Sequence, residues 1–114
     1  MNKYNCIFLD RDGTLNPDSG YISSINNFSF FDFTISSLKK IADIGNRFCI
    51  VTNQSGVSRG LIQKQDLLEI HDHIVRKFRN HSIPLLGIYF CTDHPDHPTH
   101  NRKPGSGMFQ RAKL

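Results

Sequence analysis

The sequence of 114 residues has no tryptophan, only three cysteines and no long hydrophobic run. No apolar segment approaches the roughly 18–20 residues of a membrane span, and the N-terminus lacks the basic and then apolar layout of a secretory signal peptide. Cys6, Cys49 and Cys91 cannot form an even-numbered disulfide framework, and two of them lie in apolar, strand-like runs. We interpret them as small buried thiols and expect a cytoplasmic protein.

The composition is that of an ordinary folded domain. Hydrophobic residues make up 38% of the chain and charged residues 21%, and 114 residues suffice for one small core. We therefore interpret residues 1–114 as a single domain without a repeat, a linker or a low-complexity tract. The net charge of +4 suits an anionic ligand or nucleic acid. Because the basic residues are scattered, charge alone does not choose between these partners.

Apolar segments of two kinds alternate along the chain. Short continuous runs bounded by turn residues are typical of buried strands, whereas apolar residues at helical spacing are typical of amphipathic helices. Their alternation predicts an α/β fold, a Rossmann-like three-layer sandwich with a parallel sheet between layers of helices. The predicted elements are a strand over 4–10, a helix over 34–45, a strand over 47–52, a helix over 63–80, a strand over 85–91 and the start of a helix near 106.

Two details of the predicted helices concern single residues. Thr34 stands where it can cap the N-terminus of the first helix, and Gly45 stands where a helix normally stops. His71 and His73 fall within the second helix, and we interpret both as partly buried or surface histidines.

Two carboxylates follow the first strand, in the stretch FLDRDGTLN. Ligands of parallel α/β sheets bind beyond the carboxyl ends of the strands, where Asp10 and Asp12 lie. An ionised aspartate can attack phosphorus, and a second carboxylate can transfer a proton to the leaving oxygen. Two anions repel a phosphate unless a divalent cation is present, and carboxylate oxygens suit Mg²⁺. We therefore expect a nucleophile at Asp10, an acid and base at Asp12, and a magnesium site at both.

The two other strands end in groups that bind phosphate. Thr52 and Asn53 close the second strand with a hydroxyl, an amide and backbone donors. After the third strand, Lys103 can neutralise a nucleophile and a phosphoryl group, and Arg102 can fork onto a substrate anion. A lone Asp-x-Asp-Gly-Thr could be a turn with capping aspartates, a lone Thr-Asn is usually turn chemistry, and an isolated Arg-Lys-Pro is usually a surface feature. All three in order at successive strand ends predict a site for phosphoryl transfer.

These motifs resemble those of the haloacid dehalogenase superfamily of phosphatases, which use an aspartate nucleophile. The stretches DRDGTLN, VTNQSG and RKP look like its first three motifs. Within it, DRDGTLN…GYI, VTNQSGVSRG and RKPGSGM are most similar to the D,D-heptose 1,7-bisphosphate phosphatase and histidinol-phosphate phosphatase group. The resemblance implies a Mg²⁺-dependent phosphomonoesterase of a small phosphorylated metabolite, in carbohydrate metabolism or histidine biosynthesis. It also implies an aspartyl-phosphate intermediate and little or no cap domain.

The resemblance also implies a role for each matching residue. Asp10 is the implied nucleophile, and Asp12 is the implied general acid and base, with its main-chain carbonyl on Mg²⁺. The implied phosphate ligands are Thr52, Asn53 and Lys103, and the implied substrate contacts are Arg102 and the loop SGVSRG with Arg59.

Two departures from the family pattern concern metal ions. The heptose group often holds a structural zinc through a Cys-x-His pair and a later Cys-x-Cys pair. Here Cys91 matches, and His94, His97 and His100 follow it, but we favour a metal-free loop over a zinc site of these four residues. The superfamily's fourth motif, an acidic residue that completes the magnesium site, has no counterpart before Leu114. We therefore expect the C-terminal part of the fold to be missing and catalysis from these residues alone to be weak or absent.

Two alternatives to a metabolite phosphatase stay open. Polynucleotide 3′-phosphatases also carry Asp-x-Asp-Gly-Thr, a similar TNQ-x-G and a motif like KPGSGM, and the basic charge leans toward them. The opening DRDGTLN…GYI and the short chain favour the metabolite group, so nucleic acid is the less favoured partner. The third interpretation is a non-catalytic remnant that binds phosphate through Thr52, Lys103 and backbone amides without turnover. We expect no membrane partner.

Overall fold

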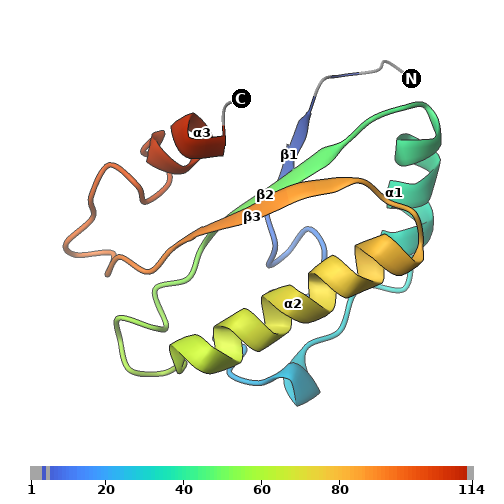
Figure 1. Cartoon of the computed structure of the whole chain (residues 1–114). Coiled ribbons are helices and arrows are strands. Elements are labelled where there is room, and N and C mark those ends of the chain that lie inside the picture. Colours follow the sequence, from blue (N-terminus) through green and yellow to red (C-terminus); the bar gives the residue numbers. More distant parts are fainter. Residues whose placement is uncertain (1–3, 5, 113–114) are drawn as a thin grey trace.

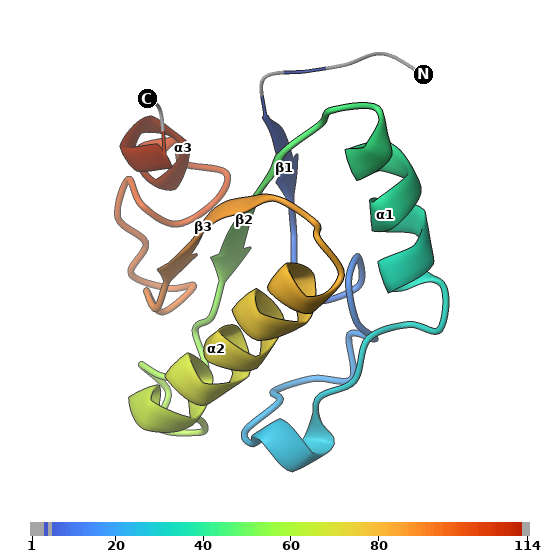
Figure 2. The ribbon, with the colours of Figure 1, turned by 45° about the vertical axis from the view of Figure 1, so that its right-hand side comes forward.

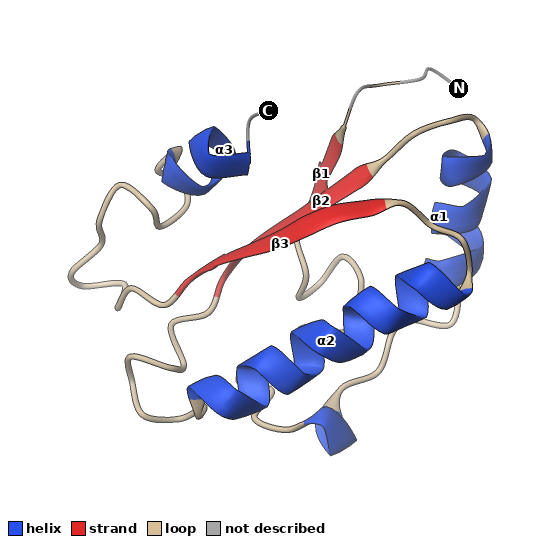
Figure 3. Ribbon diagram, in the orientation of Figure 1, coloured by secondary structure: helices blue, strands red, loops and turns tan. Residues whose placement is uncertain are grey.

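The computed structural model describes residue 4 and residues 6–112. Strands and helices alternate along this part of the chain, as the sequence predicts, and Figure 3 shows the strands grouped between the helices. The elements in order are β1 (Ile7–Leu9), the short 3₁₀ helix η1 (Ile25–Asn27), α1 (Thr34–Asp43), β2 (Phe48–Asn53), α2 (Lys64–Asn80), β3 (Leu85–Cys91) and α3 (Gly107–Ala112).

The three described strands form one parallel sheet in the order β1-β2-β3. The central strand β2 pairs Cys49 with Phe8 of β1 and Ile50 with Ile88 of β3. Its first five residues are buried, because the strand has a neighbour on each side and helices over both faces. A continuous apolar run is what such a position requires. The prediction of an α/β fold with a parallel sheet is confirmed.

Alternate residues of β2 point into two separate cores, because successive side chains of a strand face opposite sides of the sheet. Phe48 and Ile50 lie in the larger core, which α1 and α2 cover. Val51 lies in the smaller core and packs with Cys91 and Met108 of α3. Figure 2 shows the result, with α1 and α2 to the right of and below the sheet and α3 to its left. In Figure 1 the same three helices surround the strands.

The element boundaries agree closely with the sequence, with one correction at the start of α1. Thr34 is the first helical residue and Phe33 is the N-cap, so the prediction of Thr34 as N-cap is wrong. The Thr34 hydroxyl instead donates to the Leu15 carbonyl at 2.8 Å and ties α1 to the loop after β1. Gly45 ends the helix as predicted, with a φ of 102° that favours glycine. Within the predicted strand over 4–10, β1 covers Ile7–Leu9, and residue 5 lies outside the described residues.

None of the helices in the described part of the chain is long and apolar enough to cross a membrane.

Candidate functional site

A cavity of about 430 Å³ opens beyond the carboxyl ends of β1 and β2, where parallel α/β sheets bind ligands. Residues from three separate loops meet there, so the folding of the sheet brings most of the predicted site together. The predicted residues on its wall are Asp10, Asp12, Thr52, Asn53 and Lys103. The other residues on its wall are Asp18, Gly20, Tyr21, Gln54 and Ser55.

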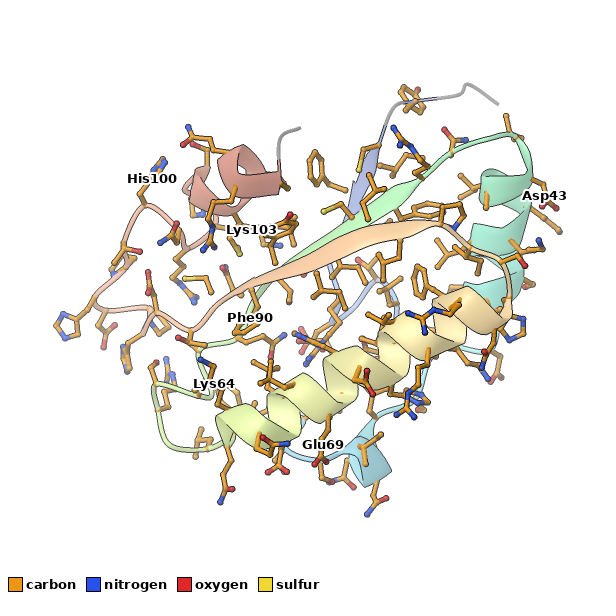
Figure 4. All side chains as sticks on the ribbon, viewed as in Figure 1. Asp43, Lys64, Glu69, Phe90, His100 and Lys103 are labelled. Atoms are coloured by element: carbon orange, nitrogen blue, oxygen red, sulfur yellow. The ribbon has the colours of Figure 1, made fainter. Side chains whose placement is uncertain are left out.

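Asp10 presents a half-exposed carboxylate to this cavity, with 48% of its side chain exposed. Its Oδ1 accepts a hydrogen bond from the Arg11 backbone N–H at 2.8 Å. The same oxygen lies 3.2 Å from the Lys103 ammonium, which also donates to the Val51 carbonyl at 2.9 Å. Lys103 is therefore fixed between the ends of β1 and β2, and Figure 4 shows it below α3. Asp10 remains accessible to a ligand while a cation neutralises one of its oxygens.

The Asp12 carboxylate is held by four hydrogen-bond donors and is only 20% exposed. Its Oδ1 accepts from Arg11 Nε and from Asn16 Nδ2, both at 2.9 Å. Its Oδ2 accepts from Arg11 Nη2 at 3.2 Å and from Gln54 Nε2 at 3.0 Å. A carboxylate has about four lone-pair sites, and these donors occupy them. The orientation of Asp12 is thus fixed, whereas Asp10 has more freedom.

The guanidinium that holds Asp12 is fully buried, and it has partners on every side. Arg11 Nη2 also donates to Gln54 Oε1 at 3.1 Å, and Nη1 lies 3.2 Å from His71 Nε2. The guanidinium carbon lies 5.9 Å from the centre of the Phe28 ring, which gives a cation–π contact. Burial, and next the Arg11 charge, lower the pKa of His71 to about 4, so His71 is neutral at pH 7 and can accept from Arg11.

Sequence reasoning missed this buried group. The structure corrects the interpretation of His71 as partly buried or surface, since only 6% of the residue is exposed. No role was predicted for Arg11 or for Gln54. A buried Arg needs acceptors, but the sequence does not show that α2 brings His71 to it. Asp18 and Tyr21 were also not predicted as site residues, although Tyr21 lies in the GYI stretch that contributes to the family resemblance.

At the end of β2 two adjacent polar residues have different neighbours. The Thr52 hydroxyl is buried and accepts from Gln54 Nε2 at 2.9 Å. The Asn53 amide bonds the backbone of Lys103 twice: Nδ2 donates to the Lys103 carbonyl at 3.2 Å, and Oδ1 accepts from the Lys103 N–H at 3.0 Å. Asn53 therefore joins the end of β2 to the loop after β3 and places Lys103 beside Asp10.

Two predicted substrate contacts, Arg59 and Arg102, do not line the cavity. Arg102 Nη1 donates to the Asp93 carbonyl at 3.2 Å, within the loop after β3. The Arg59 guanidinium lies 5.8 Å from the centre of the Tyr21 ring, and Tyr21 is part of the cavity wall. Arg59 thus supports one wall of the cavity from outside.

The oxygen donors at the cavity fit a hard cation such as Mg²⁺. The Asp10 carboxylate opens to the cavity, and carboxylate oxygens are ligands that Mg²⁺ prefers. Asp12 adds no free side-chain oxygen, because four donors already occupy its carboxylate. No group of three or more His, Cys, Asp or Glu side chains within residues 4 and 6–112 is arranged to hold a metal ion.

The four residues of the candidate zinc site have other surroundings. Cys91 is buried in the smaller core, and the His94 and His97 rings are 6.0 Å apart in the loop after β3. His100 Nε2 lies 3.1 Å from Gln110 Oε1 of α3, and Figure 4 shows His100 on the outer side of this loop. From the sequence we favoured a loop without zinc, and in such a loop these four residues do not have to lie close together.

Comparisons with known proteins agree with the geometry. The family model described as polynucleotide kinase 3 phosphatase matches residues 5–114. The D-glycero-beta-D-manno-heptose-1,7-bisphosphate 7-phosphatase of Yersinia pestis is 38% identical over 94% of this chain and 61% of its own length. The enzyme of the same name from Haemophilus influenzae is 39% identical over 98% of this chain and 63% of its own length. The chain thus spans about three fifths of the curated relatives it matches.

Two solved structures have the same fold. D,D-heptose 1,7-bisphosphate phosphatase from B. bronchiseptica, complexed with magnesium and phosphate, has a TM-score of 0.85 and 29% identity, and covers 95% of this chain and 61% of its own. A HAD-like phosphatase from Mesorhizobium loti, named as putative, has a TM-score of 0.82 and 25% identity, and covers 96% of this chain and 56% of its own.

Proposed function

The chain belongs to the polynucleotide kinase 3 phosphatase family, and we propose that it is a magnesium-dependent phosphomonoesterase of a small phosphorylated sugar. Residues 1–114 are proposed as one phosphatase domain. The observation that carries the proposal is the Asp10 carboxylate, which is open to the cavity and lies 3.2 Å from the Lys103 ammonium. A nucleophile needs both features, because it must reach phosphorus and approach an anion without repulsion.

The proposed reaction has two displacements at phosphorus. An Asp10 oxygen forms a bond to phosphorus while the bond to the leaving oxygen breaks. One of the four hydrogen bonds to Asp12 opens as the substrate binds, and the freed oxygen carries the proton that Asp12 gives to the leaving oxygen. Asp12 then takes a proton from a water molecule, whose oxygen attacks phosphorus and releases phosphate and the free Asp10 carboxylate. When bound, Mg²⁺ would neutralise phosphate oxygens, with Asp10 and the Asp12 main chain as its ligands.

The remaining residues bind the phosphate and place the cation. Lys103 neutralises the negative charge of both the nucleophile and the phosphoryl oxygens, and Thr52 presents its hydroxyl beside it. Asn53 acts mainly through Lys103, whose backbone it bonds twice. Arg59 acts through Tyr21, and Arg102 shapes the loop that leads to Lys103.

The charges on the cavity wall favour a sugar over a polynucleotide. Asp18 adds a third carboxylate next to Asp10 and Asp12, whereas Lys103 is the single cation on this wall among the described residues. Carboxylates accept hydrogen bonds from sugar hydroxyls but repel the phosphates that follow one another along a nucleic acid. The names of the relatives, which act on heptose bisphosphate, point the same way. Because the matching family model is described as polynucleotide kinase 3 phosphatase, a polynucleotide 3′-phosphate is the second candidate substrate.

The free cysteines fit a cytoplasmic location, which we propose for the protein.

Phosphate release with added Mg²⁺ tests the proposal directly. The substrates are a heptose 1,7-bisphosphate, histidinol phosphate and a 3′-phosphorylated nicked DNA, each with the wild type and with Asp10→Asn. Asp43→Asn is the control, because Asp43 is an exposed aspartate of α1 paired with Lys39. We expect release from the heptose bisphosphate, loss of release in Asp10→Asn and no change in Asp43→Asn.

Other outcomes would replace this function. Faster release from the DNA end would make the protein a polynucleotide 3′-phosphatase. Binding of inorganic phosphate without any turnover, even at high enzyme concentration, would make it a phosphate-binding module.

A further inference from the structure

The buried charge at Arg11 is not explained by the binding of a phosphate. Its side chain is 1% exposed, and its guanidinium faces Asp12, Gln54 and His71 rather than the cavity. A buried cation is costly unless its N–H groups find acceptors. The arrangement of these acceptors therefore indicates what Arg11 is held for.

Three of the acceptors lead back to one carboxylate. Arg11 Nε and Nη2 bond the two Asp12 oxygens as a fork, which fixes the plane of the carboxylate. Gln54 accepts from Arg11 Nη2 through Oε1 and donates to Asp12 Oδ2 through Nε2, so it closes a ring of hydrogen bonds. On the far side of the guanidinium, the acceptor for Nη1 is His71 Nε2 at 3.2 Å.

We infer that His71 and Gln54 are positioning residues that orient Asp12 for proton transfer. His71 acts through Arg11, and Gln54 acts both through Arg11 and by its own hydrogen bond to Asp12 Oδ2. The inference rests on the proposed function, because it assigns a role in the proton-transfer steps of that reaction. His71 lies 60 residues from Arg11 along the chain and reaches it from the buried face of α2. It does not line the cavity, and its hydrogen bond to Arg11 Nη1 passes its effect to Asp12 through the guanidinium.

The geometry explains why the contact of Arg11 with His71 affects its contacts with Asp12. The guanidinium is planar and rigid. If it rotates so that Nη1 reaches a new acceptor, Nε and Nη2 turn with it and leave the Asp12 oxygens. Without an acceptor at residue 71, Nη1 would be buried without a partner, and Arg11 would gain by tilting away from the fork. The Phe28 ring, 5.9 Å from the guanidinium carbon, supports one face of the plane and limits this tilt. A tilt would leave the phosphate ligands in place but misalign the proton donor.

Two substitutions separate this role from simple packing. His71→Leu fills the buried space but provides no acceptor, whereas His71→Gln keeps an acceptor oxygen. His81→Leu is the control, because His81 is an exposed histidine directly after α2. Each variant is compared with wild type for kcat and KM of phosphate release, for the Kd of inorganic phosphate and for hydrogen exchange of the Arg11 Nε–H by NMR.

We expect His71→Leu to lower kcat about tenfold, because proton transfer depends steeply on alignment, and to leave KM and the phosphate Kd nearly unchanged. His71→Gln should recover most of the lost rate, and His81→Leu should match wild type. The Arg11 Nε–H should exchange faster with water in His71→Leu alone. A wild-type kcat in His71→Leu, or an equal loss in His71→Gln or His81→Leu, would overturn the inference.

The exchange measurement keeps this inference separate from the proposed function. If the wild-type chain has no turnover, the proposed function fails for this chain, and the Arg11 exchange rate becomes the deciding result. Faster exchange in His71→Leu only would still show that His71 holds the guanidinium on Asp12. Equal exchange in wild type and all variants would overturn that role.

Discussion

Replacing His71 by glutamine should remove a pH dependence from the stability of the protein. His71 is buried on α2 against Arg11, and a cation beside it opposes its protonation. Glutamine can accept the same hydrogen bond from Arg11 but does not titrate. The two proteins therefore differ in one proton-binding site, and their difference isolates the contribution of that site.

The magnitude follows from the two pKa values of the residue. Burial first, and the Arg11 charge second, lower the pKa of His71 from 6.5 to about 4 in the folded protein. The unfolded chain therefore binds this proton near pH 6.5, and the folded protein binds it only near pH 4. Between these values the unfolded state holds more protons, so stability is complete above pH 6.5 and falls as the pH drops toward 4. Integration gives a loss of about 2 kcal/mol between pH 7 and pH 5.

Urea unfolding of wild type and His71→Gln at pH 5, 6 and 7 measures this loss. We expect wild type to lose about 2 kcal/mol more than the variant between the two extremes. His81→Gln is the control, because His81 is an exposed histidine directly after α2 and should follow wild type. Equal pH dependence in wild type and His71→Gln would refute the reasoning and show that His71 is neither buried nor beside a cation in solution.

Two further predictions concern the cavity. Lys103→Met removes the cation beside Asp10 and should weaken the binding of inorganic phosphate at least about tenfold. Calorimetry measures the Kd, and Lys40→Met, at an exposed lysine of α1, serves as the control. Equal affinities in wild type and Lys103→Met would mean that Lys103 does not contact phosphate. Gly56→Ala would place a Cβ 2.6 Å from Ile62 Cδ1 and 2.8 Å from Tyr21 Cδ1, so it should cost about 1–3 kcal/mol of unfolding free energy and raise KM by moving the Tyr21 wall. Gly60→Ala, at an open position with a φ of 72°, should lower stability without this effect on KM.

Local signals were sufficient for most of the fold. The predicted strand over 85–91 is β3 without any change, and α2 begins one residue after the predicted start at 63. Continuous apolar runs and helical spacing identify such elements, because each reflects how much of the element is buried. The resemblance to haloacid dehalogenase phosphatases, drawn from three short motifs, is confirmed by the family match and the solved relatives. Thr34 was misplaced because its hydroxyl serves a long-range contact with Leu15.

The site was predictable where chain position determines spatial position. Parallel strands bring their carboxyl ends to one edge, so Asp10, Thr52 and Lys103 could be placed together before any coordinates. The partners of Arg11 could not, because they depend on how α2 packs on the sheet and which of its residues turns inward. His71 has no motif around it, and a histidine in an amphipathic helix is more often a packing or surface residue. Long-range packing of this kind leaves no local signal.

The opening pair of carboxylates illustrates how one short stretch can give two adjacent acids different chemistry. Repulsion between Asp10 and Asp12 is reduced because each has its own cation: Lys103 beside Asp10, and Arg11 beside Asp12. The cation of Asp10 comes from a loop at the cavity, which leaves that carboxylate 48% exposed and free to react. The cation of Asp12 comes from the residue between the two acids and is buried. Its two donors, with one each from Asn16 and Gln54, fix that carboxylate. Neighbouring acids in unlike surroundings can take unlike roles. Here the difference arises because the cation of Asp10 lies at the cavity and the cation of Asp12 lies in the protein interior.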